Sequence, residues 1–337
     1  MPSRSRRFIL ILTGWLALLL GGCGAPAAPV YHIAIVASGQ SRLVKAQSLE
    51  QGLRDRGYVP EENLYITIYD AENHGDRLSE LTRQAIASDP DILVTLGGIE
   101  TQIAKKEVSD ADLPIVFIGV ADTVDWGVVA SFRHPGRGIT GIDNGYIEIT
   151  SKRLEYLTLL LPQARRVLVL YSSQITPSRA ALAQAQWAAP HLGLSLQAAD
   201  INDERALQRF ADALQPGQAD AILITPSFTL ENALPATLLP AATRAGIPIV
   251  GLNQDVVAAG GLAAYGASFQ NMGYQAARLV DKVLHGVPPG DIPVEFPDTP
   301  EFTVNRDVVT ALDLAIDPET MCLADHILPE MSTGEGP

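Results

Sequence analysis

Short apolar runs recur along the chain, and polar stretches of helix length separate them. The same order of runs appears in both halves, at 32–38, 91–98 and 113–120 and again at 166–173, 220–227 and 247–254. Each run is rich in β-branched residues, which is typical of strands that a parallel sheet buries on both faces. Segments such as 41–56 and 177–191 carry helical patterns long enough for crossovers between parallel strands. The pattern predicts an α/β protein with two doubly wound parallel-sheet lobes.

The N-terminal residues have the pattern of an export signal. Arg4, Arg6 and Arg7 precede an uncharged stretch from Phe8 to Gly22, which suits a signal peptide and is shorter than the roughly 20 residues of a membrane span. The sequence Leu-Gly-Gly-Cys that ends at Cys23 resembles a bacterial lipobox. We therefore expect residues 1–22 to be a lipoprotein signal peptide and Cys23 to be lipidated and membrane-anchored; an ordinary cleavage site with a chance cysteine is the alternative.

Composition narrows the choice of partners. The chain carries 24 Lys and Arg against 38 Asp and Glu, a formal net charge of −14, and loss of the basic leader makes it more negative. Binding to nucleic acid requires clustered Lys and Arg, so we expect no nucleic-acid partner. If Cys23 is lipidated, Cys322 has no cysteine partner, and the six histidines are scattered. We therefore expect no disulfide, no metal and no cofactor.

The candidate ligand site follows from the positions of the carboxyl ends of the predicted strands. Ligands of open α/β sheets bind outside the carboxyl ends of the strands, and small-molecule sites often lie between domains. The candidates are therefore the small and polar residues in the loops that follow the predicted strands: Gly39, Gln40, Gly98, Glu100, Thr101, Asp122, Thr123, Ser172, Ser173, Thr225, Ser227, Asn253 and Asp255.

These candidates suit a small zwitterion or polar amide. Helix N-termini after Gly98 and Ser173 would receive a carboxylate. Asp255 is the first choice for an ammonium partner, followed by Glu100 and Asp122. Two alternatives stay open: Asp122 caps the turn after its strand, or Glu100 is a solvated acid in the first turn of a helix.

Enzyme motifs are missing from the sequence. It contains no G-x-S-x-G, no G-x-x-x-x-G-K-[ST] and no H-E-x-x-H. Residues 136–141 match G-x-G-x-x-G, but no strand precedes them and no helix follows, so they predict a turn that leads into a strand. We therefore expect a binding protein without catalytic residues; a hydrolase on the same fold is the less favoured alternative.

Three stretches, 113–143, 148–171 and 246–305, resemble ABC transporter substrate-binding proteins of the tryptophan/tyrosine-binding type. The most specific part is the end, where a glycine-rich run, a helix, the turn PPGDIPVE and a strand ending in Asn305 keep the family's order. The resemblance extends from about Tyr31 to Asp317. It implies a type I periplasmic-binding fold and a lipid-anchored extracytoplasmic receptor. Such a receptor closes on a small polar ligand, an amino acid or related amide, and delivers it to a permease driven by an ATPase.

The lobe boundaries and the rival function complete the expectations. We expect one lobe from residues 31–141 and 267–290, a second from 142–266 and 291–317, a hinge where the chain crosses between them, and a flexible tail over 318–337. We expect a monomer. A sensory binding protein that presents its ligand to a membrane receptor kinase is the alternative function.

Overall fold

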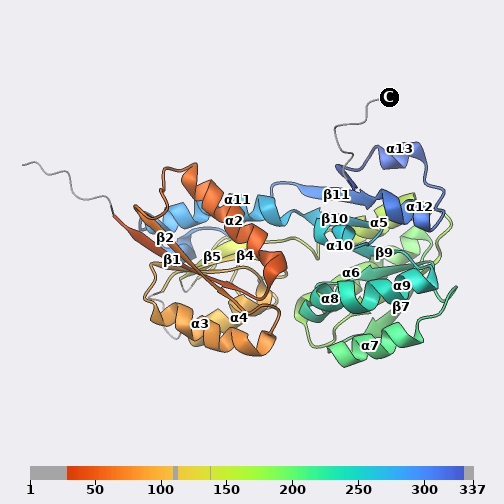
Figure 1. Ribbon diagram of the computed structural model, residues 1–337, viewed down its shortest axis with the longest axis horizontal. Coiled ribbons are helices and arrows are strands. Elements are labelled where there is room, and N and C mark those ends of the chain that lie inside the picture. The colour runs from red at the N-terminus through yellow and green to blue at the C-terminus, as the bar shows by residue number, and fades with distance from the viewer. Residues whose placement is uncertain (1–28, 109–112, 137, 330–337) are drawn as a thin grey trace, which may run out of the picture. The chain divides into compact units, whose positions relative to one another are not determined.

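The computed structural model describes residues 29–108, 113–136 and 138–329, so the predicted leader and Cys23 lie outside the described residues. The described residues from Tyr31 onward form one compact unit that contains two sheets. Figure 1 shows these sheets with helices packed around them.

The first sheet has five parallel strands in the order β2-β1-β3-β4-β5. The strands are β1 (Tyr31–Ala37), β2 (Leu64–Asp70), β3 (Ile92–Thr95), β4 (Ile115–Val120) and β5 (Ile139–Asp143). Helices α2 (Leu43–Arg54) and α11 (Phe269–Leu284) cover one face, and α3 (Leu78–Ala87) and α4 (Gly98–Glu107) cover the other (Figure 1). Alternation along β1 explains this arrangement, because Ile33 and Ile35 pack toward α2 and α11 while Ala34 and Val36 pack toward α3 and α4.

The second sheet has the order β12-β11-β10-β9-β8-β6-β7. Its strands are β6 (Arg166–Tyr171), β7 (Ser195–Asp200), β8 (Ala221–Ile224), β9 (Ile249–Gly251), β10 (Ala263–Ala267), β11 (Pro300–Asn305) and β12 (His326–Leu328). Val167 and Val169 pack with α5 (Thr150–Leu160) and α6 (Thr176–Ala188). Leu168 and Leu170 face α7 (Glu204–Ala213), α8 (Phe228–Ala233) and α9 (Leu239–Ala245).

The remaining elements are short. They comprise the helices α10 (Gln254–Ala258), α12 (Arg306–Ala311) and α13 (Pro318–Met321), the 3₁₀ turns η1 (Gln40–Arg42), η2 (Gly75–Arg77), η3 (Ala189–Leu192) and η5 (Pro289–Asp291), and one π-helical turn, η4 (Leu234–Leu238).

The two-lobed α/β fold predicted from the apolar runs is confirmed, with one difference in strand direction. Strand β11 runs antiparallel to β10, and the other pairings of both sheets are parallel. The reason is the path of the chain, which leaves β10, forms α11 against the first sheet and returns to the second sheet from that side. The turn predicted for 136–141 leads into β5 as expected.

Two expectations about the C-terminal third need correction. Residues 292–295 are predicted in the second lobe, but they lie beside β5 of the first sheet. There the Asp143 N–H donates to the Glu295 carbonyl, the Glu295 N–H donates to the Gly141 carbonyl, and Ile292 and Val294 are buried. The tail after Pro318 was expected to be flexible. The segment is ordered as far as Pro329, because the Asp317 side chain caps the N-terminus of α13 and β12 pairs with β11.

Close packing of α11 on α2 depends on two glycines. A Cβ at Gly273 would lie 2.3 Å from the carbonyl oxygen of Lys45, and a Cβ at Gly52 would lie 2.7 Å from the Cβ of Ala277. Because both positions lack a side chain, the helices approach closely. This contact places Lys45 of α2 beside Phe269, the first residue of α11.

Candidate functional site

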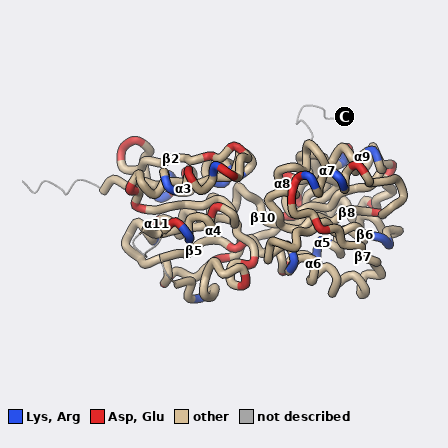
Figure 2. Tube along the Cα trace, turned by 90° about the horizontal axis from the view of Figure 1, so that it is seen from below, with Lys and Arg blue, Asp and Glu red and all other residues tan. Residues whose placement is uncertain are grey.

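Buried charge points to the site. Figure 2 shows acidic and basic residues interspersed over both lobes. Among the described residues, five charged side chains are nevertheless buried: Arg42, Lys45, Glu100, Asp143 and Arg153. Burying a charge is costly unless it is paired or hydrogen-bonded, and two of these residues, Arg42 and Glu100, line one cavity.

The cavity lies between the two lobes at the carboxyl ends of their strands and has a volume of about 60 Å³. Gly98 opens α4 after β3, Gly119 and Ala121 lie at the end of β4, and Pro226 and Ser227 follow β8. Both lobes therefore contribute to the wall, at the edge where ligands of parallel sheets bind.

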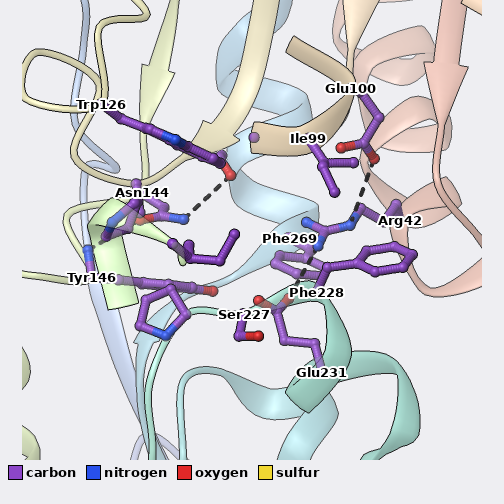
Figure 3. Close-up of a pocket in the computed structure, with 16 residues that line it drawn as sticks. Arg42, Ile99, Glu100, Trp126, Asn144, Tyr146, Ser227, Phe228, Glu231 and Phe269 are labelled. Atoms are coloured by element: carbon purple, nitrogen blue, oxygen red, sulfur yellow. Dashed lines mark hydrogen bonds and ion pairs between the residues drawn. The ribbon is translucent and has the colours of Figure 1, made fainter. Parts of the chain in front are cut away.

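Four aromatic side chains line the cavity: Trp126, Tyr146, Phe228 and Phe269 (Figure 3). The indole of Trp126 lies against Gly98, where an added Cβ would be 2.1 Å from Cζ3 of the ring. Two hydrogen bonds through its backbone hold Trp126. Its backbone N–H donates to the Asp122 carbonyl, and its backbone carbonyl accepts from Gln102 Nε2 at 2.9 Å. The aromatic groups give the cavity broad apolar faces.

A charged group borders the cavity at Arg42, in η1 directly after β1. Arg42 Nη2 donates to Glu231 Oε2 at 3.1 Å, and its Nε lies 3.8 Å from Glu100 Oε1. Glu231 belongs to α8, so the first contact joins the two lobes (Figure 3). Burial by itself would lower the pKa of Arg42, but Glu231 and Glu100 outweigh it and raise the pKa above its ordinary value.

Lys45 lies behind this group and is fully buried. Its Nζ donates to the carbonyls of Leu96 at 2.8 Å and Ile118 at 3.2 Å, and it sits 4.0 Å from the ring centroid of Phe269. Loss of hydration lowers its pKa to about 7, and the nearby Arg42 adds to this effect. A second cation thus lies close to the cavity, separated from it by the Phe269 ring.

Tyr146 follows β5, where the chain crosses between the lobes, and hydrogen bonds from the second lobe fix it. Its hydroxyl accepts from Asn253 Nδ2 at 3.2 Å, and its carbonyl accepts from Arg153 Nη1 at 2.8 Å. Arg153 also donates from Nε to the Tyr265 carbonyl at 2.8 Å, and burial lowers its pKa to about 10. Arg153 therefore ties the segment after β5 to strand β10.

Three of the residues proposed from sequence line the cavity: Gly98, Glu100 and Ser227. Glu100 is not solvated, because it is 1% exposed and its Oε1 accepts from the Ser38 N–H at 2.9 Å. Asn253 contacts the lining residue Tyr146 and caps α10.

The other proposed residues lie outside the lining, and most are hydrogen-bonded to other groups of their own lobe. Thr101, Thr123, Ser172 and Thr225 are buried and hydrogen-bonded to nearby groups, Gln40 donates to Asp70, and Ser173 bonds Asp200. Gly39 packs against Asn73, where a Cβ would meet the Oδ1 atom at 1.8 Å.

Two proposed acids stand apart from the cavity. Asp122 follows β4 in a left-handed conformation, and its Oδ2 is buried without a hydrogen-bond partner. Burial raises its pKa to about 6, and Asp125, Asp143 and Glu148 add to the shift. Asp255 is an exposed residue in the first turn of α10.

Sequence reasoning missed six lining residues that carry most of the site's chemistry: Arg42, Trp126, Tyr146, Phe228, Glu231 and Phe269. They lie in turns, first helical turns or lobe crossings, a few residues beyond the loop positions considered. Trp126, one of three tryptophans in the chain, was a usable signal because it follows a predicted strand end.

The arrangement defines a class of protein. Two parallel-sheet lobes, joined by crossing segments and enclosing a cavity with aromatic walls and a charged end, form a two-lobed ligand-binding protein. In the described part of the chain, His, Cys, Asp and Glu nowhere gather in a group able to hold a metal. No helix in the same part is both long and apolar enough to cross a membrane.

The comparisons with known proteins agree with this class. Residues 31–328 match the family "ABC transporter substrate binding protein", and the chain belongs to that family. Its members are extracytoplasmic binding components of ABC transporters, not enzymes. The predictions of the family and of a binding role are therefore confirmed.

Individual relatives are more distant. A tyrosine-binding protein of Clostridioides difficile (strain R20291) is 26% identical over 283 residues, which cover 82% of this chain and 80% of that protein. A Streptococcus pneumonia ABC domain solved in complex with L-Trp has a TM-score of 0.79 at 20% identity, over 89% of this chain and 100% of that one. A conserved domain protein of Vibrio cholerae has a TM-score of 0.80 at 22% identity, over 88% and 99% of the chains. The structural matches establish the fold.

Proposed function

We propose that this substrate-binding protein is the lipid-anchored receptor of an importer and that its ligand is an amino acid with an aromatic side chain. The observation that carries the ligand class is the composition of the cavity wall. Trp126, Tyr146, Phe228 and Phe269 surround a space that has Arg42, Glu100 and Glu231 at one end. The receptor would release the ligand to a permease that a separate ATPase drives.

The physical argument rests on complementarity. A flat apolar group stacks on or meets the edges of aromatic side chains at a gain of about 0.5–1.5 kcal/mol per pair beyond area burial. Charged groups at one end suit the ammonium and carboxylate that all amino acids share. The names of the tyrosine-binding relative and of the L-Trp complex support the same class. This proposal narrows the polar amino acid or amide expected from sequence.

Calorimetry on the full-length protein tests the ligand class. We expect L-Trp, L-Tyr or L-Phe to bind at least about tenfold more tightly than L-Leu, since loss of stacking and of apolar contact costs more than about 1.4 kcal/mol. Equal binding of L-Leu, or binding of none of the aromatic amino acids, would contradict the proposal.

A pair of tryptophan variants locates the binding site. Trp126→Ala removes a wall of the cavity and should weaken binding of the best aromatic amino acid by about tenfold or more. Trp187→Ala is the matched control, because Trp187 is 67% exposed on α6 and does not line the cavity. Equal losses in both variants would place the ligand elsewhere.

A further inference from the structure

We propose that Arg42 and Glu231 together recognise the head group of the ligand, with Glu231 binding the ammonium and Arg42 binding the carboxylate. This inference rests on the proposed function, from which it takes the amino-acid class of ligand. The two residues lie on different lobes, 189 positions apart in sequence, and both line the cavity.

Arg42 has hydrogen-bonding capacity to spare. A guanidinium has five N–H donors, yet within the described residues the guanidinium of Arg42 makes one hydrogen bond, from Nη2 to Glu231. Its contact with Glu100, at 3.8 Å from Nε, is an ion pair beyond hydrogen-bond distance. Since Arg42 is 8% exposed and borders the cavity, water satisfies the remaining donors poorly, and a carboxylate is the acceptor that fits their planar geometry.

Glu231 is the matching acceptor. Its Oε2 accepts from Arg42, its Oε1 has no partner in the hydrogen bonds of the described residues, and its side chain is 22% exposed at the cavity. Glu100 has a different role. It is 1% exposed and accepts a hydrogen bond from the Ser38 N–H. Glu100 is therefore a positioning residue, which holds Arg42 in place and balances its charge, and Glu231 binds the ligand.

The signs of the charges favour an ammonium group at this end. Arg42 and Lys45 contribute at most two positive charges, and Glu100, Glu231 and Asp255 contribute three negative charges that act on them. An ammonium beside Glu231 compensates the excess, and a carboxylate on the same ligand atom then meets Arg42. A ligand with both groups replaces the direct contact between Arg42 and Glu231 and binds one lobe through each residue.

Analogues that lack one charge should therefore bind less tightly. Tryptamine keeps the ammonium, and indole-3-propionate keeps the carboxylate; each leaves one cavity residue without its new partner. A site built for two polar groups discriminates strongly against ligands that lack one. We expect both analogues to bind wild-type protein at least about tenfold more weakly than L-Trp.

Two charge-removing variants, Glu231→Gln and Arg42→Gln, test the assignment by calorimetry with these three probes. Glu231→Gln should weaken L-Trp and tryptamine at least about tenfold and leave indole-3-propionate within about threefold. Arg42→Gln should give the reverse pattern, with L-Trp and indole-3-propionate weakened and tryptamine nearly unaffected. A general loss of fold would weaken all three probes alike, so the pattern itself separates recognition from misfolding.

Two control variants and two contrasting outcomes separate the head-group assignment from the proposed function. Glu204→Gln, an exposed first-turn acid of α7, and Arg54→Gln, an exposed residue of α2, should leave all affinities unchanged. If wild-type protein binds L-Trp and the two test variants show no probe-specific losses, the head-group assignment is overturned while the proposed function stands. If wild-type protein binds no aromatic amino acid, the proposed function itself fails.

Discussion

At the scale of single residues, Lys45 has the most unusual environment. Its ammonium is fully buried and rests on two carbonyl oxygens and the face of Phe269. Carboxylates of Glu100, Glu231 and Asp255 act on it from a distance, while Arg42 opposes the charge. Carbonyl dipoles and an aromatic face replace only part of the lost hydration. Burial therefore lowers the pKa of Lys45 to about 7.

This environment predicts a pH-dependent contribution to stability. The pKa of Lys45 is about 7 in the folded protein and 10.5 ordinarily, so between these values the unfolded chain binds the additional proton. Stability from this residue therefore rises with pH across that window, by up to about 1.4 kcal/mol per pH unit. Below pH 7 the lysine is charged in both states and contributes no slope.

Urea unfolding of wild type and Lys45→Met at several pH values between 7 and 10 measures this effect. The difference in unfolding free energy between the two proteins should change with pH in favour of wild type as the pH rises. Lys152→Met, in an exposed ion pair with Glu155, is the control and should show no such trend. A pH-independent difference for Lys45→Met would show that the ammonium is not disfavoured by burial.

At the scale of elements, the C-terminal segment completes the second sheet. Asn305 ends β11 and joins three elements: its Oδ1 accepts from Val308 N–H at 3.1 Å to cap α12, and its Nδ2 donates to the Val257 carbonyl of α10 at 2.9 Å. The residue is 8% exposed. One buried side chain thus fixes α12 and α10 against the end of the strand.

Asn305→Ala should lower the free energy of unfolding by about 2 kcal/mol, of which about 1 is the lost cap and about 1 the lost bond to α10. Asp203→Ala supplies the comparison, because Asp203 caps α7 through Ala206 N–H at the surface and makes no second bond of this kind. Denaturant unfolding of both variants measures the difference. Equal losses would mean that the bond to Val257 adds nothing.

At the scale of the whole molecule, the lobes are linked by three chain crossings, after β5, after β10 and before β11. Arg153 holds the first crossing to the strand that precedes the second, through the carbonyls of Tyr146 and Tyr265. Several crossings restrict lobe movement to a hinge path, and the cavity lies beside them. We therefore expect lobe closure and ligand contact to be coupled through Tyr146, which lines the cavity.

The predicted membrane anchor also concerns the whole molecule. We predict that Cys23 is lipidated, because the residues that end at Cys23 resemble a lipobox. Two or more acyl chains give stable anchoring, whereas one gives reversible binding. A tethered receptor reaches its permease at a raised effective concentration. Wild-type protein should fractionate with membranes and carry an N-terminal lipid mass, and Cys23→Ser should carry none. Identical lipid mass on Cys23→Ser, measured by mass spectrometry, would contradict the assignment.

Local sequence was sufficient for the architecture of this protein. The runs at 32–38 and 166–173 correspond to β1 and β6, and the helical segments 41–56 and 177–191 correspond to α2 and α6. Apolar periodicity is a property of neighbouring residues, and it dictates which faces are buried. The parallel direction of most strands follows because helical segments long enough for crossovers separate the runs.

The composition of the cavity was decided by the tertiary structure. Strand ends correctly indicated Gly98, Glu100 and Ser227 as lining residues, but nothing local distinguishes them from Thr101 or Thr225, whose hydroxyls donate to the Gly97 and Leu170 carbonyls within their own lobes. The pairing of Arg42 with Glu231 and the addition of β12 to β11 depend on segments far apart in sequence. Such contacts are set by how the two lobes and their crossings pack, because the energy of a buried charge or an edge strand depends on its partner and not on its own neighbours in the chain.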